Sequence, residues 1–214
     1  MKALVLVNGE LHQPDVLRQR IRADVFGLVL GADGGAHHAV TLNVTLDAVI
    51  GDLDSLSDLT QRALATARFV SYPPEKDETD LELALTYAQA QGADRIVLVG
   101  AMGGRMDMTI ANILLLAGAN LASSRIEVWQ GEQTGWVISP PGEDVTGHPG
   151  DTLSLIPLGG HASGITTKGL EYALRNEELS FAPARGISNL METPSVHIKL
   201  SKGLLLTIHT PGQA

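Results

Sequence analysis

The 214-residue sequence contains no cysteine. Disulfide bonds, thiolate nucleophiles and sulfur-ligated zinc or iron sites are therefore excluded, and any metal ion must be bound by oxygen or imidazole ligands. The seven histidines show no HExxH spacing, so we expect them to be surface or structural residues.

Long apolar runs and an excess of basic residues are also missing. The longest apolar stretch, residues 110–119, is interrupted by Asn112 and is well below the ~18 to 20 residues of a membrane span. The apolar run at residues 3–7 is too short for a secretory signal. With 24 acidic and 15 basic residues the formal charge is -9, which is the wrong sign for binding nucleic acid or an anionic membrane. We expect a cytoplasmic protein that binds small molecules.

Up to residue 131 the sequence alternates short β-branched runs with segments of helical period. This alternation predicts an α/β domain, 1–131, with an open, largely parallel sheet and flanking helices. One predicted helix carries Leu81, Leu85 and Ala88 on one face, with a capping box at Thr79 and Glu82. A second has its apolar face within residues 110–121. The expected strands are 3–7, 26–30, 48–50, 69–72, 95–99 and 126–130.

After residue 131 glycine and proline separate short apolar runs, and no segment has helix-length periodicity. This pattern predicts a second domain, 132–214, that is an all-β sandwich. The expected strands are 135–138, 152–156, 196–200 and 204–209. We expect the last two to form a hairpin around Lys202-Gly203.

Charged residues gather directly after successive predicted strands of the first domain. In chain order the clusters are Asp33; Asp52 and Asp54; Lys76, Asp77 and Asp80; and Arg105 with Asp107. Because the carboxyl ends of parallel strands share one edge of a sheet, we expect these clusters to converge in a crevice there.

Six carboxylates facing two cationic side chains would resist joint ionisation unless a divalent cation joined them. Oxygen ligands favour a hard cation, and Mg²⁺ is commonly bound by one or two carboxylates together with substrate phosphates. The glycines before Arg105 would let a phosphate approach the backbone, and the guanidinium would bind it bidentately. The clusters together therefore predict a Mg-ATP site.

Each cluster taken alone also has a structural explanation. Asp33 would fit a turn, Asp54 a helix cap, and residues 76–80 a solvated helix start. Known nucleotide motifs do not decide the question. Segments 31–35 and 100–104 lack dinucleotide-binding spacing, and in segment 159–165 an isoleucine stands where a P-loop requires lysine.

These loops, in this order, resemble those of the thiamine pyrophosphokinase family. The resembling segments are Asp-Gly-Gly-Ala at 33–36, Gly-Asp-Leu-Asp-Ser at 51–55, Lys-Asp-Glu-Thr-Asp at 76–80, Gly-Gly-Arg-Met-Asp at 103–107, and, in the second domain, 154–158, 164–172 and 186–189. The resemblance implies a nucleotide- and magnesium-binding first domain, a thiamine-binding second domain, and a homodimer with shared active sites. The implied reaction moves a pyrophosphoryl group from ATP to the hydroxyl of thiamine and releases AMP.

The resemblance also implies roles for individual residues. It implies magnesium ligands at Asp33, Asp52, Asp54 and Asp80, and an ATP site with Gly34, Gly35, Lys76, Asp77, Gly104, Arg105, Asp107, Thr167 and Lys168. It implies that Tyr172 stacks on thiamine, with Ser188 and Asn189 hydrogen-bonding nearby. The catalytic candidates are Asp54 and Asp80 as proton acceptors and Arg105 as a stabiliser of charge. One departure is Met108, where the family often has histidine.

Two alternatives remain. Segment 48–54 loosely imitates the haloacid dehalogenase phosphatases, which need a covalent phosphate on an aspartate such as Asp52, but the sequence lacks a convincing late acidic pair after a strand. A non-catalytic sensor of thiamine or a nucleotide is the other, and the six retained acids argue against it.

Overall fold

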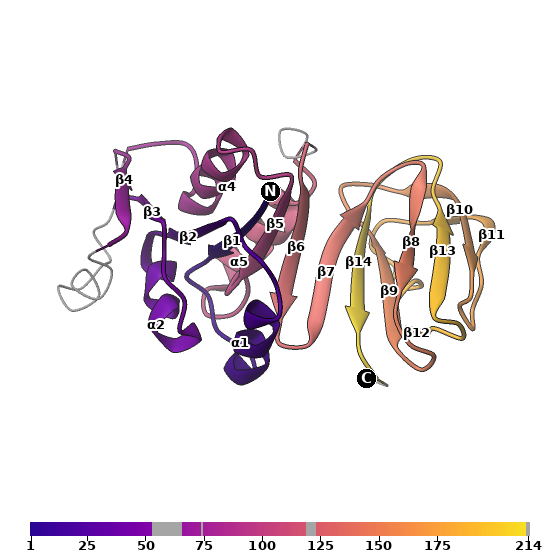
Figure 1. Cartoon of the computed structure of the whole chain (residues 1–214). Coiled ribbons are helices and arrows are strands. Elements are labelled where there is room, and N and C mark those ends of the chain that lie inside the picture. The colour runs from indigo at the N-terminus through magenta and orange to yellow at the C-terminus, as the bar shows by residue number, and fades with distance from the viewer. Residues whose placement is uncertain (53–65, 74, 119–122, 213–214) are drawn as a thin grey trace. The chain divides into compact units, whose positions relative to one another are not determined.

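The computed structural model describes residues 1–52, 66–73, 75–118 and 123–212. The chain divides into two compact units, Met1–Gly131 and Glu132–Ala214, each labelled by element in Figure 1. Among the described residues, no helix is both long enough and apolar enough to cross a membrane.

The first unit is built on a parallel sheet with the strand order β6-β5-β1-β2-β3-β4. Its strands are β1 (Lys2–Leu6), β2 (Leu28–Ala32), β3 (Ala48–Gly51), β4 (Arg68–Ser71), β5 (Arg95–Val99) and β6 (Arg125–Gln130). The predicted open parallel sheet is confirmed, with strand ends displaced by at most two residues. The order in which strands are added to the sheet reverses at β1, because β2 pairs on one side of β1 and β5 on the other.

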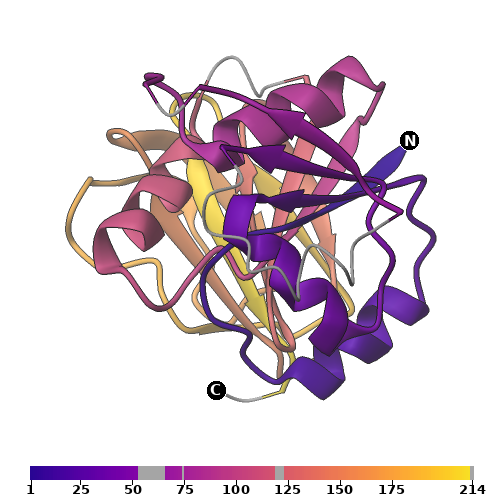
Figure 2. The same cartoon turned by 90° about the vertical axis from the view of Figure 1, so that its left-hand side faces the viewer.

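Helices cover both faces of this sheet. They are α1 (Pro14–Arg22), the 3₁₀ helix η1 (Asp33–His37), α2 (His38–Leu42), α4 (Asp80–Ala90) and α5 (Met106–Leu115). Leu4 and Leu6 of β1 pack in one buried cluster with residues of α1 and α2. Successive strand residues face opposite sides of a sheet, so the buried Ala3 and Val5 face the other layer, where α4 lies against β2 and β3 (Figures 1 and 2).

The starts and faces of the helices agree only in part with the sequence pattern. Thr79 accepts a hydrogen bond from the Glu82 amide at 3.2 Å, as its predicted cap position requires. The apolar face predicted within residues 110–121 is wrong in detail, because Ile110 and Leu114 of α5 are 52% and 54% exposed. Helix α5 is apolar on nearly every side, so periodicity could not choose its buried face.

The second unit consists of two antiparallel sheets, with the orders β12-β9-β14-β7 and β11-β10-β13-β8. Its strands are β7 (Gln133–Ile138), β8 (Gly142–Thr146), β9 (Thr152–Pro157), β10 (Ala162–Lys168), β11 (Arg175–Leu179), β12 (Asn189–Leu190), β13 (Ser195–Lys199) and β14 (Leu205–Thr210). One buried cluster draws side chains from both sheets, including Leu155 and Leu205 from the first and Ile165 and Ile198 from the second. The predicted β-sandwich is confirmed.

The predicted hairpin of the last two strands is wrong. Strand β13 pairs with β8 and β10, whereas β14 pairs with β7 and β9 in the other sheet. The chain bends at Gly203, but Lys202 bridges to Ser163 of β10, and a Cβ on Gly203 would lie 2.5 Å from the His161 carbonyl oxygen. Burying Ile198 and Leu205 from opposite sides of the core requires the chain to change sheets at this turn.

A buried carboxylate ties together the end of β14 and the segment beside β12. Asp151 accepts hydrogen bonds from the amides of His148 and Gly212, each at 2.8 Å, and from His209 Nε2 at 2.7 Å. Its own carbonyl accepts the Met191 amide at 2.9 Å, directly after β12. Burial raises the pKa of Asp151, but the three hydrogen bonds outweigh burial and lower it to about 2.

We expect Asp151→Asn to flatten the acid dependence of stability. A lowered carboxyl pKa stabilises the fold above the unfolded value of 3.8, and that stabilisation is lost as the pH falls toward about 2. The wild-type melting temperature should therefore fall steeply across this window, while the variant starts lower at neutral pH and changes less. Asp144→Asn, on the exposed face of β8, is the matched control. Parallel profiles for Asp151→Asn and wild type would contradict this account.

Candidate functional site

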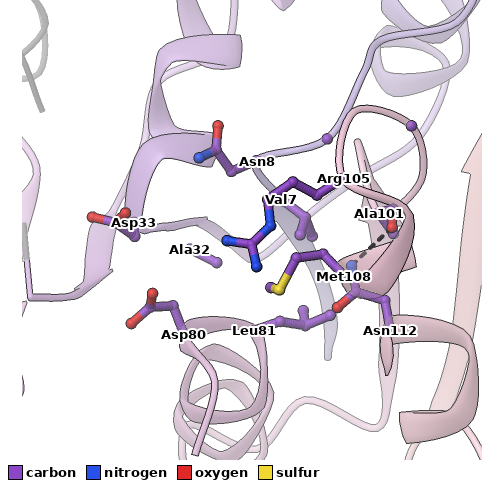
Figure 3. A pocket seen from close by; sticks show the side chains of 12 residues that line it. Val7, Asn8, Ala32, Asp33, Asp80, Leu81, Ala101, Arg105, Met108 and Asn112 are labelled. Atoms are coloured by element: carbon purple, nitrogen blue, oxygen red, sulfur yellow. Dashed lines mark hydrogen bonds between the residues drawn. The ribbon is translucent and has the colours of Figure 1, made fainter. Parts of the chain in front are cut away.

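A cavity of about 240 Å³ lies at the carboxyl edge of the parallel sheet (Figure 3). Its walls come from the segments after β1, β2 and β5 and from the starts of α4 and α5. The lining residues are Val7, Asn8, Gly9, Ala32, Asp33, Asp80, Leu81, Ala101, Gly103, Arg105, Met108 and Asn112. Three predicted site residues, Asp33, Asp80 and Arg105, are among them.

Backbone hydrogen bonds join the loops after β1 and β5 below this cavity. The Gly9 amide donates to the Gly100 carbonyl at 2.7 Å, and the next amide, Glu10, donates to Met102 at 2.8 Å. The loops approach so closely that a Cβ on Gly9 would lie 2.4 Å from the Met102 oxygen. His38 Nε2 lies 2.9 Å from the Gly9 carbonyl oxygen, which can only accept, so this ring nitrogen carries the proton. Burial lowers the pKa of His38, and the neighbouring His37 lowers it further.

Asp33 and Asp80 meet across the end of β3, where Gly51 leaves room for them. A Cβ on Gly51 would lie 2.9 Å from the Asp33 Cβ and 3.1 Å from Asp80 Oδ1. Asp33 itself has a left-handed backbone, with φ 43°, which is a costly conformation for a non-glycine residue. Lys76 Nζ lies 2.5 Å from Asp80 Oδ1 and balances part of the acidic charge. Two carboxylates and one ammonium from two segments that are distant in the chain are thus brought together.

Arg105 projects from the start of α5 into the same space. Figure 3 shows its guanidinium between Asn8 and Met108, directed toward the side that holds Asp33 and Asp80. Its Nη2 lies 2.6 Å from Asp107 Oδ2, and its Nε lies 3.1 Å from Oδ1. This bidentate bond lowers the pKa of Asp107 and raises the pKa of Arg105. Because both side chains are more than half exposed, the arginine can exchange its partner for a ligand oxygen at little cost.

Asp52 and Asp54, predicted for the metal, and Asp77, predicted for the ATP site, lie differently. Asp52 is half-buried directly after β3, and Asp77 is exposed. Asp54 lies outside the described residues. Among the residues that are described, no group of three or more His, Asp or Glu side chains is arranged to hold a metal ion. The pair of Asp33 and Asp80 supplies hard oxygen donors, which suit Mg²⁺, but two carboxylates alone leave several coordination positions to other ligands.

The glycines predicted for the nucleotide site have unequal surroundings. Gly34 and Gly35 are buried in η1, and a Cβ on Gly35 would lie 2.3 Å from the Leu6 carbonyl oxygen. The absence of a side chain at Gly35 is thus required for packing on β1. Gly104 has φ 68° and open space around its Cβ position, so a ligand can approach its backbone.

The second unit has its own cavity, of about 500 Å³. It is lined by Leu155, Glu171, Tyr172, Ala173, Leu174, Arg175, Arg185, Gly186, Ile187 and Asn189. The Tyr172 amide donates to Asn189 Oδ1 at 3.0 Å, and Asn189 Nδ2 donates to the Tyr172 carbonyl at 2.9 Å. This reciprocal pair fixes the backbone at Tyr172, a residue that is 68% exposed.

Three further predicted residues of this unit do not line either cavity. Ser188 has φ 56°, and its amide donates to Ser154 Oγ at 3.0 Å. Thr167 is buried, and its Oγ1 accepts the Leu174 amide at 2.8 Å, which holds the end of β10 to the next segment. Lys168 is exposed at the end of β10.

Sequence reasoning missed five polar or charged residues of these cavities. Asn8 and Asn112 line the first, and Glu171, Arg175 and Arg185 line the second. An asparagine inside the otherwise apolar segment 110–119 was a usable signal, since a buried amide must find partners. Glu171 directly precedes Tyr172, and no comparable sequence pattern singles it out.

Comparison with known proteins gives one consistent result. The family model "Thiamin pyrophosphokinase, catalytic domain" matches residues 24–129, and "Thiamin pyrophosphokinase, vitamin B1 binding domain" matches residues 139–205. A curated thiamine pyrophosphokinase of Bacillus subtilis is 29% identical over 191 residues, which cover 87% of this chain and 89% of that protein.

Solved structures agree with these matches. The thiamine pyrophosphokinase structure from Bacillus subtilis has a TM-score of 0.86 at 26% identity and covers 99% of both chains. The structure from Geobacillus thermodenitrificans has a TM-score of 0.83 at 28% identity, covering 100% of this chain and 99% of that one.

We expect Gly51→Ala to destabilise the site edge. The new Cβ would lie 2.9 Å from Asp33 Cβ and 3.1 Å from Asp80 Oδ1, so both side chains would have to move, and overpacking of this kind costs about 1–3 kcal/mol. Urea unfolding should show the loss as a lower midpoint. Gly135→Ala is the control, because its Cβ would find its nearest neighbours at 3.9 Å. Equal midpoints for the two variants would show that Gly51 is not a packing requirement.

Proposed function

The chain belongs to the thiamine pyrophosphokinase family and is an enzyme, and from this premise we propose that it transfers a pyrophosphoryl group from Mg-ATP to the hydroxyl of thiamine. The products are thiamine diphosphate and AMP. The observation that carries the proposal is the meeting of Asp33, Asp80 and Lys76 beside Arg105 at one rim of the sheet. Phosphoryl-transfer sites need this combination of metal-binding oxygens and phosphate-binding cations.

In this proposal residues 1–131 bind Mg-ATP. Arg105 exchanges its contact with Asp107 for phosphate oxygens, which its planar fork can bind bidentately. Lys76 contacts Asp80, so its ammonium is close enough to bind the same phosphate oxygens. The open backbone at Gly104 leaves room for a phosphate at the start of α5, where the helix dipole favours an anion.

The metal in this proposal is Mg²⁺, with Asp33, Asp52, Asp54 and Asp80 as its protein ligands. Asp33 and Asp80 support this choice because they already share the space beside Gly51. When bound, the cation would neutralise charge on the transferring phosphates. Asp52 directly follows β3, which places its backbone at the same edge.

The chemical step needs a proton acceptor for the alcohol of thiamine. The hydroxyl oxygen forms a bond to the β-phosphorus, the bond from that phosphorus to the bridging oxygen of AMP breaks, and the proton passes to a carboxylate. Asp80 or Asp54 is the proposed acceptor. Arg105 stabilises the charge that develops on the phosphoryl oxygens.

Residues 132–214 bind thiamine in this proposal. The exposed ring of Tyr172 offers a face for stacking, and Asn189 holds its backbone in place. Ser188 is proposed to bind near the same ring. The carboxylate of Glu171, on the same cavity wall, suits the positive charge of the thiazolium, and an aromatic face attracts such a cation as well.

The proposed setting is a cytoplasmic homodimer with shared active sites. A solution mass of twice 22.6 kDa would support the dimer. Neither a nucleic acid nor a membrane is among the proposed partners. The comparisons do not favour the phosphatase and sensor alternatives, because both matched models describe thiamine pyrophosphokinase domains.

The proposal is tested by the nucleotide product. Incubation with thiamine and Mg-ATP should yield AMP and thiamine diphosphate in equal amounts, separated and counted by ion-exchange chromatography. Asp80→Asn should lose most of the turnover while keeping its fold, because it removes one oxygen charge beside Asp33. Formation of ADP or inorganic phosphate instead of AMP would refute the proposed reaction.

We expect Glu171→Gln to weaken thiamine binding without changing the chemical step. An exposed carboxylate facing a cation contributes modestly, so KM for thiamine should rise about two- to five-fold, with kcat nearly unchanged. Glu178→Gln, on an exposed glutamate outside the cavity lining, is the matched control. A fall in kcat at constant KM would place Glu171 in another role.

A further inference from the structure

Asn112 is a polar residue inside the apolar helix α5. Its side chain is buried, with the residue 4% exposed, and its Nδ2 donates a hydrogen bond to the Ala101 carbonyl at 2.8 Å. A carbonyl oxygen can only accept, so the amide must turn its NH₂ toward Ala101 and its Oδ1 the other way. Figure 3 shows this oxygen on the side of Met108 and Leu81, within the cavity lining.

The orientation leaves an acceptor aimed at the cavity. Within the part of the chain that the structure describes, Asn112 Oδ1 accepts no hydrogen bond, and the buried polar atoms without a partner do not include it. An acceptor that faces the space of a cavity is hydrated until a ligand replaces the water, and a ligand without a donor there then loses affinity. A ligand that fills the cavity is therefore expected to bring a donor to this position.

The two ends of the cavity differ in chemistry. Asp33, Asp80 and Arg105 lie toward one side, whereas Leu81 and Met108 give the side near Asn112 an apolar character (Figure 3). A matching ligand has a charged end and a flat, largely apolar end with an N–H at its edge. A nucleoside triphosphate whose base carries an exocyclic amino group has this form.

We propose that Asn112 Oδ1 accepts a hydrogen bond from the 6-amino group of the purine of ATP and thereby makes the site selective for 6-amino over 6-oxo purines. The inference rests on the proposed use of ATP and adds the residue that reads its base. A 6-oxo purine would place a carbonyl oxygen against Oδ1. The bond to Ala101 prevents the amide from turning over to offer its NH₂ instead, so the selectivity is built into the fold.

The test compares ATP with ITP, which carries a 6-oxo group. For the wild-type enzyme, kcat/KM should be about ten- to a hundred-fold higher with ATP, as expected when a buried acceptor loses its donor. Asn112→Leu, which has the same number of side-chain heavy atoms and no acceptor, should bring the ratio near one, mainly by losing activity with ATP. Gln89→Leu is the matched control, because it removes an amide that donates to Ser123 and Ser124, and none of these residues lines the cavity. It should keep the wild-type ratio.

Several outcomes would overturn the inference. Equal use of ATP and ITP by the wild-type enzyme would do so without any variant, which matters if Asn112→Leu fails to fold. An unchanged ratio in a folded Asn112→Leu would do the same, as would an effect confined to KM for thiamine. If no AMP forms at all, the proposed function fails, and the ratio of Kd values for ATP and ITP from calorimetry still tests the inference.

Discussion

The approach of Asp33 and Asp80 across Gly51 is the constraint on which the candidate site depends. Parallel pairing of β2, β3 and β4 aligns their carboxyl ends, and the missing side chain at Gly51 lets the two acids share one space. Like charges so placed repel one another unless cations lie between them. Lys76 supplies one positive charge. The remaining imbalance is the physical reason to expect a divalent cation and phosphates at this edge.

The floor of the same cavity is made rigid by the backbone rather than by charge. Gly9 and Gly100 let the loops after β1 and β5 approach to hydrogen-bonding distance. The ring of buried His38 donates a hydrogen bond to the Gly9 carbonyl. Asn112 continues this pattern, since it fixes the Ala101 carbonyl at 2.8 Å. A cavity whose walls are held by such bonds presents its polar atoms in set directions, which selective binding of a flat ring requires.

In the second unit, too, hydrogen bonds hold a candidate binding surface in place. Asp151 ties the end of β14 to the segment after β12, and Asn189 of β12 in turn holds Tyr172. The ring and the neighbouring Glu171 are therefore presented by a short edge strand that depends on a buried carboxylate for its position. An aromatic face beside an acid suits a cationic heterocycle, which agrees with the thiamine-binding role proposed for this unit.

The sequence by itself determined the layers and most strand positions, because β-branched runs and helical periods report local backbone preference and burial. It also indicated Asp33, Asp80 and Arg105, since residues after parallel strands must lie at one edge. Tertiary structure decided the rest. The buried face of α5 and the separation of β13 from β14 depend on which surfaces pack together, and the aim of the Asn112 oxygen depends on the Ala101 carbonyl opposite it. Each of these features depends on contacts with residues elsewhere in the chain or on how a side chain is turned, so no local sequence pattern could specify it.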